Sequence, residues 1–198
     1  SELGRLEEAE AVYKKAIIVN PGYVEAHSNL GNTLRELGKL EEAEASYRRA
    51  IVLSPNFADA HNNLAVTLKE LGKLEEAEAS YNQSLFHKPG VAQTHYNLGN
   101  TLRQLGKLEM ARASYKQSTT LSPDYAIAHL FLGITLNDLG RLKESEVSYR
   151  QAIKCKPDYA EAHCYLAGTL KEQGKAEAAQ VSYRRAITLR PDFPEAHY

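Results

Sequence analysis

The chain has 198 residues, of which 43% are hydrophobic and 25% charged, with a formal net charge of −1. This is the composition of a folded globular protein, and 24 basic against 25 acidic residues favour neither nucleic acid nor an anionic membrane surface as a partner. No apolar run approaches the about 20 residues that span a bilayer.

Cysteine usage bears on the compartment. Cys155 and Cys164 are the two cysteines, and neither belongs to a C-x-x-C motif. Such sparse thiols favour a reducing compartment, or a protein indifferent to redox conditions, over a disulfide framework. We therefore expect a soluble, intracellular protein of the cytoplasm without a structural disulfide.

One period of 34 residues runs through the chain. It is kept by prolines at 21, 55, 89, 123, 157 and 191, by histidines at 27, 61, 95, 129, 163 and 197, and by glycines at 4, 38, 72, 106, 140 and 174. A period in the range of 20–50 residues indicates a solenoid, in which each unit buries its apolar face against its neighbours.

The first 23 residues carry the pattern of one helix. Its apolar stripe consists of Leu6, Ala9, Tyr13 and Ala16, and the same spacing recurs in the second half of every later unit. We expect residues 1–23 to be the second helix of a partial unit, and residues 194–198 to start a further one. Both ends thus fall inside a unit. The chain is either a fragment of a longer array or a molecule whose ends stack on those of its neighbours.

Residues 24–57 contain two amphipathic stretches. The first has Ala26, His27, Leu30, Gly31, Leu34 and Leu37 at helical spacing, and the second has Leu40, Ala43, Tyr47, Ala50 and Ile51. Gly38 lies between them, where the first helix must end and the chain reverse, and Pro55 stops the second helix. Each unit is therefore predicted to be a helix, a tight turn and a second helix.

The residue after the proline is polar in four units, as Asn56, Asp124, Asp158 and Asp192. Such side chains cap helix N-termini, so we expect them to cap the next helix. Glu161 and Glu195 follow three residues after the last two, which predicts capping boxes there.

These residues carry a resemblance to a known family. The tetratricopeptide pattern W-x₂-L-G-x₂-Y…A-x₃-F…P is matched here by His27-x₂-Leu30-Gly31-x₂-Leu34…Ala43-x₃-Tyr47…Pro55. The resemblance covers five complete units: 24–57, 58–91, 92–125, 126–159 and 160–193. His replaces Trp, Leu replaces the first Tyr, and Ser145 replaces the small Ala of the fourth unit. The resemblance implies an all-α fold, a right-handed α-solenoid (superhelix) of antiparallel helix pairs whose first helices line a concave groove.

Asparagines are concentrated on the predicted groove face of the first three complete units. They are Asn29, Asn63 and Asn97, one per unit, with Asn32, Asn62 and Asn100 beside them. The row resembles the asparagine ladder of O-linked N-acetylglucosamine transferases, where such amides hold the backbone of an extended peptide. An amide both donates and accepts, so it can pair with any peptide group. A solvated polar face is the alternative interpretation.

The fourth unit has apolar side chains at the groove positions. These are Ile127, Leu130, Phe131 and Ile134, while His129, Leu132, Gly133 and Leu136 are expected to face the core. A helix that is apolar on both sides is normally covered on both sides. With Tyr96 before it and Tyr165 after it, this patch is expected to contact protein, either a foreign partner, the chain's own superhelix or a second copy.

Two other site types are not favoured. A carboxylate clamp needs three cations in the groove, but Ser28, Gln93 and Asn97 stand at those positions. The histidine column places one ring on each unit, and helices pack about 8–10 Å apart, too far for ligands that share one zinc ion. No catalytic motif occurs either. We expect no enzyme activity in this segment, no cofactor and no metal.

Three functions follow from these observations. The first is a protein–protein interaction scaffold that binds an extended or helical polypeptide segment in the groove. The second is the substrate-recognition arm of a larger enzyme, such as a glycosyltransferase of the O-linked N-acetylglucosamine transferase kind. The third is a self-assembling module, a homo-oligomer formed through the terminal helices or the Ile127–Ile134 patch.

Overall fold

The computed structural model describes residues 2–192, and its regular structure is entirely α-helical. The described helices are α1 (Glu2–Val19), α2 (Val24–Glu36), α3 (Leu40–Leu53), α4 (Ala58–Glu70), α5 (Leu74–His87), α6 (Ala92–Gln104), α7 (Leu108–Leu121), α8 (Ala126–Asp138), α9 (Leu142–Cys155), α10 (Ala160–Glu172) and α11 (Ala176–Leu189). Residues 194–198, which include Glu195 and His197, lie outside the described residues. The expected further unit and the capping box at Glu195 are therefore not tested.

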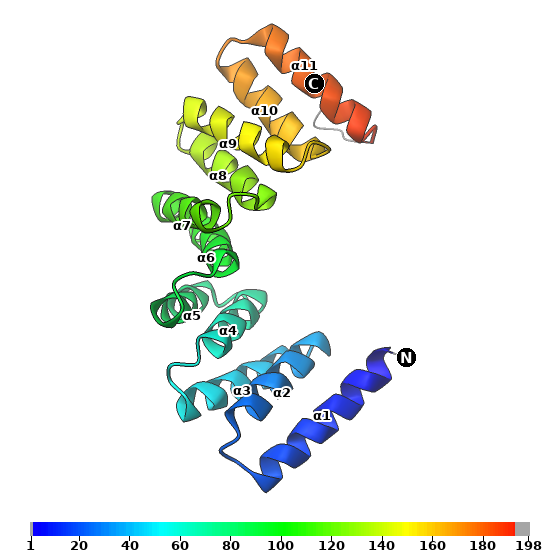
Figure 1. Ribbon diagram of the computed structural model, residues 1–198, viewed down its shortest axis with the longest axis vertical. Helices are drawn as coiled ribbons and strands as arrows, with labels where there is room; N and C mark the ends of the chain where they lie inside the picture. Colours follow the sequence, from blue (N-terminus) through cyan, green and yellow to red (C-terminus); the bar gives the residue numbers. More distant parts are fainter. Residues whose placement is uncertain (1, 193–198) are drawn as a thin grey trace. The chain divides into compact units, whose positions relative to one another are not determined.

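The helices belong to two compact parts, residues 1–105 and residues 106–198. In the first part α2 packs on α3 and α4 on α5; in the second, α8 packs on α9 and α10 on α11. The partners of each pair run antiparallel (Figure 1), and the second helix of one pair also packs on the first helix of the next, as α3 does on α4. The fold is thus the predicted all-α solenoid of antiparallel helix pairs.

A glycine turn joins the two helices of a pair. Gly38 has a φ of 74°, which an L side chain rarely adopts. The N–H of Lys39 then donates to the carbonyl of Leu34 at 2.8 Å, and the N–H of Gly38 to Arg35 at 2.9 Å. These two bonds form a Schellman motif, which satisfies the last carbonyls of α2 while the chain reverses.

The side-chain caps predicted at Asn56, Asp124 and Asp158 are wrong. The residue that caps each first helix is the one two positions after the proline, such as Phe57 before α4 and Tyr125 before α8, and it makes no side-chain cap bond. Asn56 instead accepts a hydrogen bond from the Ser54 hydroxyl at 2.9 Å. The asparagine lies one residue too early to reach the helix N-terminus, so it stabilises the turn.

The periodic histidines close the connection between pairs. In each described pair Nε2 of the histidine lies 2.8–3.1 Å from the carbonyl oxygen of the proline six residues earlier, as with His61 and Pro55 or His129 and Pro123. His27 and His61 are buried, and the later rings are half-buried. The histidine therefore ties the start of a first helix to the turn that precedes it, beyond the packing role that the spacing predicts.

The core lies between paired helices and is built around one tyrosine per pair. Tyr47, Tyr81, Tyr115 and Tyr149 are at most 1% exposed. The ring of Tyr47 lies against Gly31, where an added Cβ would come within 2.6 Å of the ring. Of the other residues predicted to face the core of this pair, Ala26, His27, Leu30, Leu34, Ala43 and Ala50 are buried, whereas Leu37, Leu40 and Ile51 are half-buried.

Candidate peptide-binding site

In the first part of the chain, the predicted groove asparagines form a connected hydrogen-bond network. Asn32 Oδ1 accepts a bond from the buried Tyr47 hydroxyl at 2.7 Å and another from Nδ2 of Asn63 at 3.0 Å. Nδ2 of Asn62 donates to Oδ1 of Asn63 at 3.1 Å, and Thr94 donates to Oδ1 of Asn62 at 3.2 Å. The network links α2, α3, α4 and α6, so these amides also support the packing of the array.

The remaining groove residues of this part lie on α2 and α6. Asn29 is exposed, whereas Asn97 is half-buried and its Oδ1 accepts a bond from Gln93 at 3.0 Å. Tyr96 is half-buried; burial raises the pKa of its phenol, and a hydrogen bond with Asn100 partly offsets the rise. Every asparagine in the row except Asn29 is therefore partly sheltered.

In the second part, the apolar groove residues are largely covered by their own array. Phe131 lies against the Tyr115 ring, with 6.0 Å between centroids, and Ile134 packs on the core around Tyr149. Ile127, Phe131 and Ile134 are all half-buried. Tyr165 is 46% exposed, and its ring stacks on Tyr149 with centroids 5.9 Å apart. What remains open to solvent is an aromatic edge.

Leu130 is not a groove residue, contrary to the prediction. It is 4% exposed and belongs to the core cluster with Ala162 and Leu166 of α10. It occupies the repeat position of Ser28, which is also 4% exposed. Asn62, Tyr96 and Cys164 occupy the same repeat position and are half-buried, so this position is at least partly covered in every described pair.

The chemistry of the other candidate groups is limited. Cys155 and Cys164 are both thiols, and Cys155 Sγ lies 3.4 Å from the Pro123 carbonyl oxygen. Within residues 2–192 no three His, Cys, Asp or Glu residues gather as a metal site would require. No described helix is long and apolar enough to cross a membrane.

A periodic set of ion pairs was not anticipated from the sequence. A glutamate of one second helix accepts bonds from a basic residue four positions later and from the basic residue that opens the next second helix. Glu10 pairs in this way with Lys14 and Lys39, Glu44 with Arg48 and Lys73, and Glu146 with Arg150 and Lys175. The spacing of 4 and 29 residues is present in the sequence.

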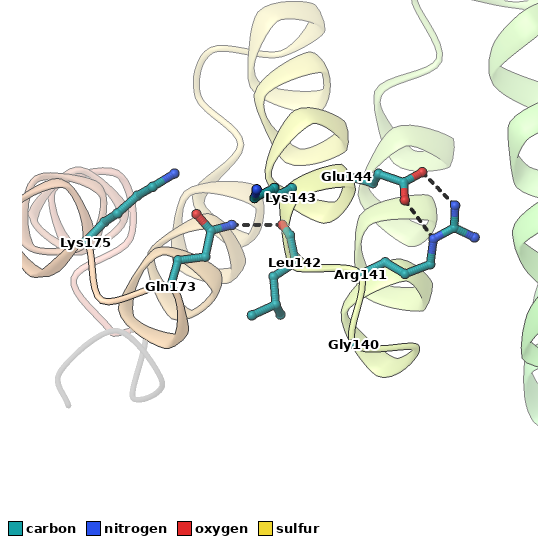
Figure 2. Close-up of a pocket in the computed structure, with 7 residues that line it drawn as sticks. All are labelled: Gly140, Arg141, Leu142, Lys143, Glu144, Gln173 and Lys175. Carbon is teal, nitrogen blue, oxygen red and sulfur yellow. Dashed lines mark hydrogen bonds and ion pairs between the residues drawn. The ribbon is translucent and has the colours of Figure 1, made fainter.

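A hollow of about 570 Å³ lies between the turn before α9 and the turn before α11. Figure 2 shows the residues that line it. Three of the polar side chains that line it are engaged within the chain: Gln173 Nε2 donates to the carbonyl of Leu142 at 3.0 Å, and Arg141 donates to Glu144 at 2.7 and 2.8 Å. These bonds join the helix pairs and leave few groups for a ligand.

Family comparisons agree with this architecture. A model described as TPR repeat matches residues 2–34, 31–72, 99–140 and 133–174, and one described as tetratricopeptide repeat matches residues 160–193. The chain belongs to the tetratricopeptide-repeat family. A comparison with curated proteins gave no match.

Solved structures of other tetratricopeptide-repeat proteins share the fold. YrrB, described as a TPR protein with an unusual peptide-binding site, is 23% identical, with a TM-score of 0.84 over 93% of this chain and 95% of YrrB. MamA is 19% identical, with a TM-score of 0.81 over 85% of this chain and 92% of MamA. PilF of Pseudomonas aeruginosa is 20% identical, with a TM-score of 0.81 over 98% of this chain and 88% of PilF.

Proposed function

We propose that this tetratricopeptide-repeat array is a protein-interaction scaffold that binds an extended peptide segment of another protein through the first-helix asparagines. The coarser role, a repeat scaffold for protein contacts, is supported by the family and by neighbours such as YrrB. The finer role, recognition of a peptide backbone, is our proposal.

The observation that carries the proposal is the state of the Asn63 amide. It donates one hydrogen bond to Asn32 and accepts one from Asn62. An amide has two N–H donors and two acceptor lone pairs, so one N–H and one lone pair remain. Two bonds hold the group in position, which reduces the entropy lost on binding. The remaining N–H can donate to the C=O of a peptide group, and the remaining lone pair can accept from a peptide N–H.

Asn97 and Asn29 extend the same chemistry at the same repeat position, 34 residues away on either side. In the second part of the chain this position is taken by Phe131 and Tyr165. The exposed edge of Tyr165, backed by Tyr149, is suited to an aromatic or aliphatic ligand side chain. Within the first part of the chain the amides thus offer affinity without sequence preference, and within the second part the aromatic residues offer selectivity for a ligand side chain.

A peptide-display screen on the full chain, followed by fluorescence anisotropy with the selected peptides, tests the proposal. Asn63→Ala should weaken binding by about tenfold, the effect of losing one or two hydrogen bonds. Asn82→Ala is the matched control, because Asn82 is an exposed asparagine on α5, and it should bind normally. Thermal melts of both variants separate lost binding from lost folding.

A second measurement examines the backbone directly. Peptides N-methylated at single positions lose one backbone donor each. At one position, methylation should weaken binding to the unmodified chain yet cause no additional loss with Asn63→Ala. The proposal would be contradicted if the selected peptides bound the Asn63→Ala and Asn97→Ala variants with the same affinity as the unmodified chain.

A further inference from the structure

One of the repeated ion-pair positions has its charge reversed. In the three triads of Glu10, Glu44 and Glu146 a carboxylate lies between two cations. At the same position α7 carries Arg112, with Lys116 four residues later and Arg141 twenty-nine residues later. This position therefore has three cations, whereas each of the other triads has one carboxylate and two cations.

Arg112 and Arg141 form ion pairs with other carboxylates, but the neighbouring lysines, Lys116 and Lys143, do not. Arg112 pairs with Glu109 at 2.7 Å and Arg141 with Glu144 at 2.7 Å, both within three residues on the chain. Neither Lys116 nor Lys143 forms an ion pair with a residue in the described range 2–192. Lys116 nevertheless contributes to lowering the pKa of Glu144, after the larger effect of the Arg141 hydrogen bond. The local charge is thus net positive.

These cations line a cleft of about 510 Å³ between α7, α8 and α9. Its rim holds Arg112, Lys116, Arg141, Lys143 and Glu144, and its apolar lining consists of Leu132, Leu136 and Val147. Leu132 is half-buried, although Leu30, Leu64, Leu98 and Leu166 at the same repeat position are at most 7% exposed. Val147 is 60% exposed. The cleft therefore offers apolar surface below a cationic rim.

We propose that this cleft is a second binding site, which takes an acidic peptide segment of a partner protein. Next to Lys116 and Arg112, a ligand carboxylate would supply the negative charge that Glu10, Glu44 and Glu146 supply in the other triads. An apolar ligand side chain would cover Leu132 and Val147. A small inorganic anion would leave that apolar surface exposed, so the combined lining favours a peptide.

The site is distinct from the asparagine row. Leu132 and Leu136 lie on the opposite side of α8 from Ile134, because residues two positions apart on a helix point about 200° apart. Binding here does not depend on the proposed peptide groove, and each proposal can fail without the other.

The test is fluorescence anisotropy with a short labelled peptide of Glu and Leu, against the same peptide with Gln in place of Glu. The acidic peptide should bind the full chain at least about tenfold more tightly than the Gln version. Arg112→Glu restores the ion-pair triad found elsewhere, so it should weaken binding at least about tenfold while the melting temperature stays equal or rises. Arg48→Glu makes the same charge change at the α3 equivalent of Lys116 and should leave affinity unchanged.

Three results would overturn the proposal. The Gln peptide binding as tightly as the acidic one would remove the role of charge. Unchanged affinity in Arg112→Glu would place the acidic peptide elsewhere. Inorganic phosphate that displaces the peptide at similar concentration would make the cleft a small-anion site.

Discussion

The hydroxyl of Tyr47 donates to Oδ1 of Asn32 across 2.7 Å, and the tyrosine itself is fully buried. Burial raises the pKa of this phenol to about 12, so it remains a neutral donor at physiological pH. The same Asn32 oxygen accepts from Asn63. One amide thus connects the core of a helix pair to the asparagine row.

Removal of this acceptor should destabilise the array. Asn32→Leu leaves a buried hydroxyl without its partner, at a cost of about 1–3 kcal/mol in the free energy of unfolding, measured by urea denaturation. Combining it with Tyr47→Phe removes both polar groups and should recover much of the loss. A double variant no more stable than Asn32→Leu alone would mean that the bond matters less than the shape of the site.

The close approach of Gly31 to Tyr47 predicts a steric effect. An alanine Cβ at position 31 would lie 2.6 Å from the ring, so Gly31→Ala should destabilise the protein by about 1–3 kcal/mol. Gly168→Ala is the matched control, because its Cβ would meet the Tyr183 hydroxyl at an ordinary 3.8 Å. That variant should be neutral or gain up to about 1 kcal/mol from helix propensity. Similar melting temperatures for both variants would contradict the prediction.

The histidine–proline bond should be measurable in a single variant. His61→Ala removes the 2.8 Å bond to the Pro55 carbonyl and should lower the free energy of unfolding by about 1 kcal/mol. His87→Ala removes an exposed ring that stacks on His61, with 5.9 Å between centroids, and contacts Phe86 edge-on, and it should have a smaller effect. Equal losses in chemical denaturation would assign the effect to ring packing.

The ion-pair triads predict a pH dependence. Hydrogen bonds from Lys175 and Arg150 lower the pKa of Glu146 despite an opposing effect of burial. A carboxyl whose folded pKa is below its unfolded value stabilises the fold above the unfolded pKa, and this stability is lost as pH falls through the folded pKa. Glu146→Gln should therefore cost about 0.5–1 kcal/mol at pH 7 and almost nothing near pH 2.

The control for the pH series is Glu177→Gln, which changes an exposed carboxyl on α11. It should leave stability at pH 7 nearly unchanged. A Glu146→Gln penalty that persists unchanged in strong acid would show that the side chain acts by packing and not by charge.

Much of this protein could be predicted from periodic residues alone. Gly38 and Pro55 mark where helices end, and the spacing of Ala43, Tyr47 and Ala50 identifies a buried face, because these effects depend on the local backbone and on helical periodicity. Predictions that needed the exact start of a helix were weaker. Asn56 is one residue too early to cap α4, a displacement that pattern reading does not resolve.

The candidate site was only partly predictable for a related reason. The asparagine row follows from repeat position, but the bond between Asn63 and Asn32 depends on how two first helices pack side by side. The groove position predicted for Leu130 is wrong because the neighbouring helix pair covers this side chain. A helix wheel describes one helix alone and does not include that pair.

The sequence by itself determined the repeat, the helix pairs and the tyrosine core, since these arise from contacts within a unit and from a period that is repeated along the chain. Only the tertiary structure decided which polar and charged groups meet across successive pairs. Those contacts join residues about 30 positions apart, such as Glu146 and Lys175, or bring cations of different helices to one cleft, as with Lys116 and Lys143. Their distances depend on the packing angle between pairs, which no single repeat encodes.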